Sequence, residues 1–142
     1  MNTLQNVKIV NASGGAANAT TLTASVDTRG FSYAMIQVHQ DVAGAVHTAA
    51  SNTKVEQSDD NSTWEAIPGL VNGTDYTPST SSVASTQPKL VLGFSLKGRK
   101  RYLKVTWGAG TTGRNIINTI LTDPSDGVAS ATDAGVTNFF MR

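Results

Sequence analysis

The chain has 142 residues, enough for one domain with a substantial core, and it contains no cysteine. The missing thiols exclude disulfide frameworks, thiolate zinc sites, iron–sulfur clusters and cysteine nucleophiles. Lysine and arginine number 11 and aspartate and glutamate 10, so a net charge of +1 provides no global field that would attract nucleic acid or a membrane. Charged residues make up only 15% of the chain, and its many threonines, serines, asparagines and glycines are typical of short strands joined by turns.

Short runs of apolar and β-branched residues recur along the chain, and turn-forming residues separate them. Their length and alternation predict strands rather than helices. The expected strands are 7–10, 21–26, 31–39, 54–57, 63–69, 90–96, 99–107 and 115–121. Residues 41–52 are small and alanine-rich, and either a short strand or a helical turn fits them, whereas 77–86 is expected to be a long polar surface loop.

About eight strands, with no long helix to cover a parallel sheet, predict an all-β fold. The expected architecture is an antiparallel β-sandwich or a jelly-roll-like small barrel with an extended C-terminal arm. Residues 1–121 form the body in this interpretation and residues 122–142 the arm. Most of the buried apolar area is expected to come from Phe31, Tyr33, Ile36, Val38, Leu92, Phe94, Leu103, Val105 and Ile117.

No set of residue types marks an active site, so we expect neither an enzyme nor a bound cofactor or metal. The two histidines, His39 and His47, lack a convergent third residue for catalysis or metal binding. Glu56 and Glu65 are the only glutamates and are expected to lie across one hairpin. A glycosidase would need a cleft with aromatic platforms beside such a pair, and the aromatic residues here are few and scattered.

Two further motifs have an ordinary structural explanation. The run at Asp59 and Asp60 lacks the central glycine of an EF-hand, so a turn capped by its own side chains is favoured over a calcium loop. Five of the 11 basic residues lie between Lys97 and Lys104, which suggests a nucleic-acid surface. Alternation divides these charges between two faces of a strand and a turn, and it places Arg101 on the same face as Leu103. No single basic patch results, so we expect salt bridges and no nucleic-acid partner.

Three segments carry a resemblance to a known class of proteins. They are Asp27-Thr-Arg-Gly-Phe-Ser-Tyr33, Lys54-Val-Glu-Gln-Ser-Asp-Asp-Asn-Ser-Thr-Trp-Glu-Ala-Ile-Pro-Gly69 and Gly98-Arg-Lys-Arg-Tyr-Leu-Lys-Val105. Over roughly residues 27–121 the chain resembles small structural proteins of tailed bacteriophages that are encoded near the capsid genes. The resemblance implies a head decoration or cement protein, or another minor virion component, and it supplies no catalytic residues.

The leading hypothesis is therefore a non-enzymatic capsid decoration protein that reinforces contacts between capsid subunits. Its expected partners are the major capsid protein or other virion subunits and further copies of itself, in a virion assembled from protein made in the bacterial host cytoplasm. No apolar run is long enough to span a membrane and the first residues show no signal-peptide pattern, so no membrane partner is expected. The alternative is a carbohydrate-binding or adhesion module of a phage tail fibre or a secreted enzyme, with Trp64 and Tyr76 as its aromatic pair.

The C-terminal segment is the strongest candidate for a binding element. Residues 122–135 contain a proline, two glycines and three aspartates, and Val128 is their only large apolar residue. Such a stretch cannot bury enough surface to order itself, yet an apolar cluster follows it. We expect an arm that carries this cluster to a neighbouring subunit; folding back as an edge strand of the same sandwich is the alternative. The predicted partner-binding residues are Val136, Phe139, Phe140, Met141 and Arg142.

Overall fold

The computed structural model describes residues 7–13, 21–40, 53–77, 88–108 and 115–124. The predictions for 41–52, for most of the polar loop and for the C-terminal segment beyond 124 lie outside these residues. The described part of the chain forms no helix long and apolar enough to cross a membrane.

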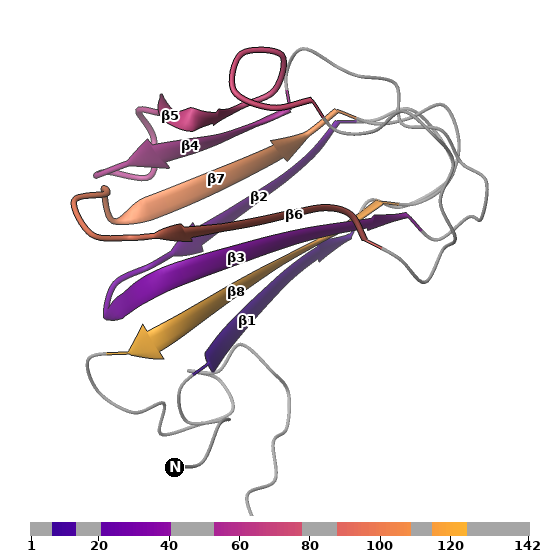
Figure 1. The fold of residues 1–142 in the computed structure, drawn as a ribbon. Coiled ribbons are helices and arrows are strands. Elements are labelled where there is room, and N and C mark those ends of the chain that lie inside the picture. Colours follow the sequence, from indigo (N-terminus) through magenta and orange to yellow (C-terminus); the bar gives the residue numbers. More distant parts are fainter. Residues whose placement is uncertain (1–6, 14–20, 41–52, 78–87, 109–114, 125–142) are drawn as a thin grey trace, which may run out of the picture.

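Eight strands make up the described residues (Figure 1), and each coincides with one of the eight predicted runs, with ends that differ by a few residues. They are β1 (Val7–Ser13), β2 (Leu22–Asp27), β3 (Phe31–Gln40), β4 (Lys54–Ser58), β5 (Glu65–Val71), β6 (Pro88–Ser95), β7 (Tyr102–Trp107) and β8 (Asn115–Pro124). β8 continues to Pro124, three residues past the expected end of that strand.

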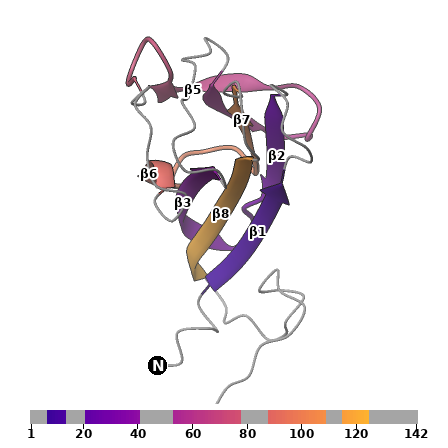
Figure 2. The same ribbon diagram turned by 90° about the vertical axis from the view of Figure 1, so that its right-hand side faces the viewer.

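The strands form two four-stranded antiparallel sheets that pack as a sandwich, as Figures 1 and 2 show. We call the sheet β1-β8-β3-β6 sheet A and the sheet β2-β7-β4-β5 sheet B. Pairing is nested: β1 pairs with β8, β2 with β7, β3 with β6 and β4 with β5. This nested order is the connectivity of an eight-stranded jelly roll, so the predicted all-β sandwich is confirmed.

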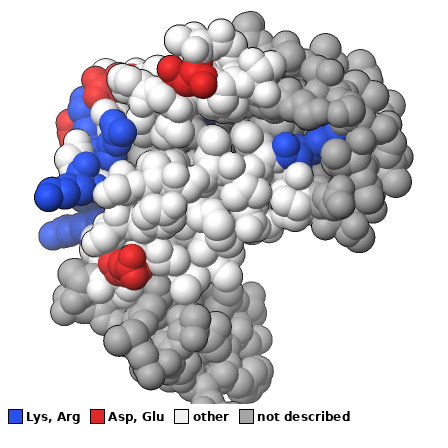
Figure 3. All heavy atoms as spheres, viewed as in Figure 1, with Lys and Arg blue, Asp and Glu red and all other residues white. Residues whose placement is uncertain are grey.

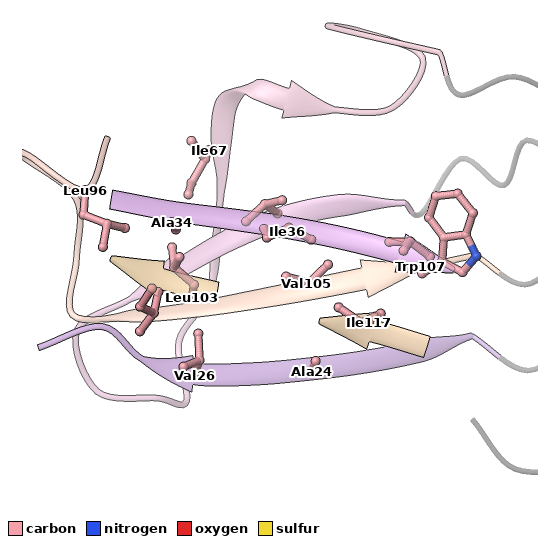
Figure 4. Close-up of a cluster of buried hydrophobic side chains, with 13 residues drawn as sticks. Ala24, Val26, Ala34, Ile36, Ile67, Leu96, Leu103, Val105, Trp107 and Ile117 are labelled. Atoms are coloured by element: carbon pink, nitrogen blue, oxygen red, sulfur yellow. The ribbon is translucent and has the colours of Figure 1, made fainter. Parts of the chain in front are cut away.

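The core lies between the inner faces of the two sheets (Figure 4), where alternate residues of most strands meet. Trp107 is the largest fully buried side chain, and its indole Nε1 donates a hydrogen bond to Oδ1 of Asn115 at 3.2 Å, which satisfies the polar end of the ring. The buried apolar residues are Ala24, Val26, Ala34, Ile36, Val38, Val55, Ile67, Leu96, Leu103, Val105, Trp107, Ile117 and Leu121.

The predicted core is largely confirmed. Five of the nine expected residues are buried, and Phe31, Leu92 and Phe94 are partly buried against the same cluster. The prediction was wrong for Tyr33, which is 38% exposed. Strand β3 places Ala34, Ile36 and Val38 on its inner face, so Tyr33 alternates onto the outer face of sheet A.

Two turns lie together at one end of the sandwich. The first joins β2 to β3 and the second joins β6 to β7, with Gly30 and Gly98 at φ values of 87° and 74°, which glycine adopts without strain. The amide and hydroxyl of Thr28 both donate to the carbonyl of Arg101, which ties the turns to each other. Arg101 is exposed and precedes β7, so it lies outside the strand in which it was expected to share a face with Leu103.

Candidate functional site

The five predicted partner-binding residues, Val136, Phe139, Phe140, Met141 and Arg142, all lie outside the described residues. The candidate site within the described chain is therefore the pair of surfaces that the sandwich presents to its surroundings. These two surfaces, the outer faces of sheets A and B, differ in charge.

Sheet B carries an ion-paired network on its outer face. The carboxylate of Glu56 on β4 contacts Nζ of Lys54 and Nζ of Lys104, each at 2.8 Å, although the Glu56 side chain is only 9% exposed. Burial acts to raise the pKa of this carboxyl, but hydrogen bonds from the two lysines outweigh it and hold that pKa below its ordinary value. Glu56 is thus an ionised structural group that two lysines neutralise.

Trp64 is part of the same network. Nζ of Lys104 lies 4.6 Å from the centre of the Trp64 ring, which is a cation–π contact, and this lysine covers one face of the indole. Tyr76 follows β5 in the chain whereas Trp64 precedes it, so the two aromatics flank opposite ends of that strand. Burial raises the pKa of the Tyr76 hydroxyl to about 12. The structure therefore does not bring Trp64 and Tyr76 together as a sugar platform.

The hairpin between β4 and β5 is closed by Asp60. One of its carboxylate oxygens accepts hydrogen bonds from the amides of Ser62 and Thr63 and from the hydroxyl of Ser58, at 2.7 to 2.9 Å. Those amides and that hydroxyl hold the pKa of Asp60 well below its usual range. The expected self-capped turn is confirmed by these bonds, and the described residues contain no cluster of three or more His, Asp or Glu that could hold a metal ion.

The basic run at the start of β7 is divided among several acidic partners. Lys100 contacts Asp59 at 3.4 Å and Glu65 at 3.3 Å, and Arg101 contacts Asp27 at 2.6 Å. The expected salt bridges are therefore present, and they use part of the positive charge of this run. Charged side chains gather at this end of the molecule in Figure 3.

The other sequence candidates are not assembled into a site. His39 lies at the end of β3 and His47 lies outside the described residues. Glu56 pairs in register with Ala66 and Glu65 with Gln57, so the two glutamates alternate onto opposite faces of the hairpin rather than facing one another. Glu65 instead accepts a hydrogen bond from Nε2 of Gln57 at 2.9 Å.

The outer face of sheet A is the second surface, and Lys89, at the β-bulge near the start of β6, is the one charged residue among the described residues that alternate onto it. We call this surface, Lys89 apart, the uncharged face. Half of its residues are apolar, and Val91 and Tyr33 are 49% and 38% exposed. The apolar members are Val7, Ile9, Tyr33, Met35, Val91, Ile116 and Ile120, and the neutral polar or small ones are Asn11, Gln37, His39, Gly93, Ser95, Asn118 and Thr122.

A hydrogen bond between β1 and β8 and a close contact between β3 and β6 organise this face. The amide of Asn11 on β1 donates to Oδ1 of Asn118 on β8, so two neutral side chains satisfy one another without a charge. The side chain of Tyr33 lies over Gly93, where a methyl group would collide with the tyrosine Oη. The charged Lys8 on β1 alternates to the inner side, where it acts on Asp27 of β2.

Sequence reasoning did not find the uncharged face, because it allowed two covered sheet faces only as an alternative to a bulge in the strand at 31–39 and did not extend this to the neighbouring strands. The adjacent pairs Ile116–Ile117 and Ile120–Leu121 on β8 are the signal that could have found it. Consecutive apolar residues in a strand point to opposite faces, so such pairs indicate a strand that is apolar on both sides.

Comparison with known proteins gives distant structural similarity only. No family model matches the chain, and no curated protein matches it. The crystal structure of the SPBc2 prophage-derived protein YomS has a TM-score of 0.45 at 14% identity, covering 82% of this chain and 95% of that one. CBM32-3 from a family 31 glycoside hydrolase of Clostridium perfringens has a TM-score of 0.39 at 13% identity, covering 81% of this chain and 75% of that one. The family 22 carbohydrate binding module of Clostridium thermocellum Xyn10B has a TM-score of 0.35 at 12% identity, covering 87% of this chain and 91% of that one.

Proposed function

We propose that this protein is a non-enzymatic structural component of a viral particle, a capsid decoration or cement protein that reinforces contacts between capsid subunits. Its partners in this proposal are the major capsid protein or other virion subunits, together with further copies of itself. It is made in the cytoplasm of a bacterial host and resides in the virion. The resemblance over residues 27–121 supplies the class of protein, and the uncharged face supplies a surface suited to that role.

The uncharged face is the observation that carries the proposal. The outer face of an antiparallel sheet ordinarily meets water and is polar, as sheet B is here. Seven apolar side chains instead lie on the outer face of sheet A, where Lys89 at the β-bulge of β6 is the only charged residue among the described ones, and exposed apolar surface of this kind marks a protein contact. Several such contacts, each weak, hold a decoration protein on a lattice through avidity.

The carbohydrate-binding alternative draws less support from the described side chains. Lys104 covers one face of the Trp64 ring, and Tyr76 lies beyond the other end of β5. A sugar platform needs an aromatic face that is open to the ligand.

Cryo-electron microscopy of the particle that encodes this chain, with and without its gene, tests the proposal. We expect ordered density at symmetry-related positions on the capsid surface in wild-type particles, and its loss when the gene is deleted. Deleted particles should lose infectivity at a lower temperature, and added purified protein should restore it. Density confined to the tail, or unchanged particles together with binding on a glycan array, would contradict the proposal.

A further inference from the structure

The uncharged face continues to the point where β8 ends. β8 lies between β1 and β3 in sheet A and contributes Ile116 and Ile120 to this face. Its last residue, Pro124, pairs with Phe31 at the start of β3, beside Tyr33. The C-terminal segment therefore leaves the sandwich at the rim of the uncharged face.

The composition of that segment complements the face. Large apolar residues are missing between Val128 and Val136, and the chain then supplies four of them: Val136, Phe139, Phe140 and Met141. Arg142 is the one charged residue in this cluster. Contact between the cluster and the uncharged face would bury apolar surface on both partners, and no charged side chain of this face would have to be desolvated.

The segment is long enough to reach a second molecule. A chain extended from Pro124 to Val136 spans roughly 40 Å, at about 3.3 Å per residue. The ten residues of β8 run about 33 Å along the face, and four strands span about 19 Å across it at about 4.8 Å each. The extended segment is longer than either dimension of the face, so it can carry its apolar cluster past the edge of its own face to that of a neighbouring copy.

We propose that the uncharged face of one copy binds the apolar C-terminal cluster, Val136 to Met141, of a second copy. Tyr33 lies next to the rim where each segment departs, and Met35 on β3 and Val91 on β6 continue the site along the face. The inference rests on the proposed assembly role and names one partner within it. Exchange of arms links copies into an oligomer, and the charged face of sheet B remains free in it.

Photo-crosslinking of the full-length protein tests this proposal. A benzophenone amino acid replaces Met35 on the uncharged face, and the matched control carries it at Ser25, which is exposed on the outer face of sheet B. Equal amounts of nitrogen-14 and nitrogen-15 protein are mixed before irradiation, so that mass spectrometry separates crosslinks between copies from those within one. We expect mixed-isotope crosslinks from position 35 to peptides of residues 125–142, and none from position 25.

Each other outcome overturns the proposal in a different way. Single-isotope crosslinks to 125–142 would show that the arm binds its own sandwich. Mixed-isotope crosslinks from position 35 to β3 or β8 would show that two uncharged faces pack directly against each other. Failure to crosslink to residues 125–142 at all would remove the arm as the occupant.

A complementation experiment checks the result without the crosslinker. Val91→Lys places a charge on the uncharged face at a position that is already 49% exposed, and Phe139→Ser with Phe140→Ser disables the arm. Sedimentation velocity should show monomers for each variant alone and dimers when the two are mixed, because one intact arm then meets one intact face. Dimers of the arm variant alone would overturn the exchange. Wild-type protein that binds particles while remaining monomeric would overturn the exchange too, yet leave the proposed function standing.

Discussion

Tyr33 of β3 lies across Gly93 of β6 on the outer face of sheet A, where its ring occupies the space that a side chain at position 93 would need. The backbone of Gly93 does not have a positive φ, so its conformation does not require glycine. The missing side chain at position 93 instead leaves room for the hydroxyl end of the Tyr33 ring.

The effect of Gly93→Ala should depend on Tyr33. In a Tyr33→Ala background the substitution should raise the free energy of unfolding by about 0.5–1 kcal/mol, because alanine loses less backbone entropy in a strand than glycine. In the wild-type background the methyl group must displace the ring, so the gain should be smaller or become a loss. Urea unfolding of the four proteins in this double-mutant cycle measures the difference. Equal effects in the two backgrounds would contradict the contact.

The same two residues show what the sequence could and could not predict. Turn residues and alternation located all eight strands, since both signals are local. Tyr33 points to the opposite face of β3 from Ile36 and Val38. From the alternation alone, either a bulge in this strand or burial of both faces of its sheet was possible. The contact with Gly93 depends on how β3 and β6 pair across the sheet, which no local pattern specifies.

The candidate site was less predictable than the fold. Salt bridges of the basic run were expected as a class, but their partners depend on register: Arg101 meets Asp27 because β2 pairs with β7, and Lys104 meets Glu56 because β4 pairs with β7. Trp107 was not included among the expected core residues. Its full burial depends on Asn115, from the start of β8, which accepts its indole hydrogen bond.

Leu103→Ala tests the assignment of β7 to the core. Leu103 is fully buried between the sheets, so truncation should lower the free energy of unfolding by about 2–5 kcal/mol through lost burial and the cavity left behind. Val91→Ala is the control, because Val91 is 49% exposed and should change that free energy by less than about 0.5 kcal/mol. A wild-type urea midpoint for the Leu103 variant would show that the inner face of β7 is assigned wrongly.

Glu56→Gln tests the ion-paired network of sheet B. The substitution keeps the shape of the side chain but leaves the ammonium groups of Lys54 and Lys104 without their shared counter-charge. We expect the free energy of unfolding to fall by about 1–2 kcal/mol, between the values of exposed and fully buried pairs. The Lys104–Trp64 contact should loosen at the same time, which tryptophan fluorescence of the folded protein would report. Unchanged stability and fluorescence would argue that the network is incidental.

The turn at Asp60 should make stability depend on acid pH. The folded pKa of Asp60 lies below its ordinary value of 3.8, so ionised Asp60 stabilises the fold above that value, and the stabilisation is lost as the pH falls from about 4 toward the folded pKa. Asp60→Asn should therefore lower the urea midpoint at pH 7, and the difference from wild type should shrink below pH 4. The depressed pKa values of Asp27 and Glu56 add to the wild-type acid sensitivity in the same direction.

Asp59→Asn is the control for that experiment. Asp59 is the adjacent carboxylate, its side chain is 73% exposed, and its salt bridge to Lys100 spans 3.4 Å. Its substitution should change the urea midpoint much less than Asp60→Asn at neutral pH. Neither protein should melt at a higher temperature when calcium is added; a calcium-dependent rise that Asp60→Asn abolishes would contradict the self-capped turn.

Deletion of residues 136–142 tests whether the apolar cluster serves assembly or the core of its own sandwich. Full burial of each such side chain is worth roughly 1.5–3 kcal/mol, so the location of that burial has a measurable effect. If the cluster binds a second copy, the truncated protein at low concentration should unfold at the same urea concentration as monomeric wild type. It should also lose self-association, measured by sedimentation velocity at increasing protein concentration.

The free energy of unfolding of the wild-type protein should rise with protein concentration, because binding of a second copy stabilises the folded state by mass action. The truncated protein should not show this rise. A loss of several kcal/mol in the dilute, monomeric truncated protein would place the cluster in its own sandwich and contradict the exchange of arms.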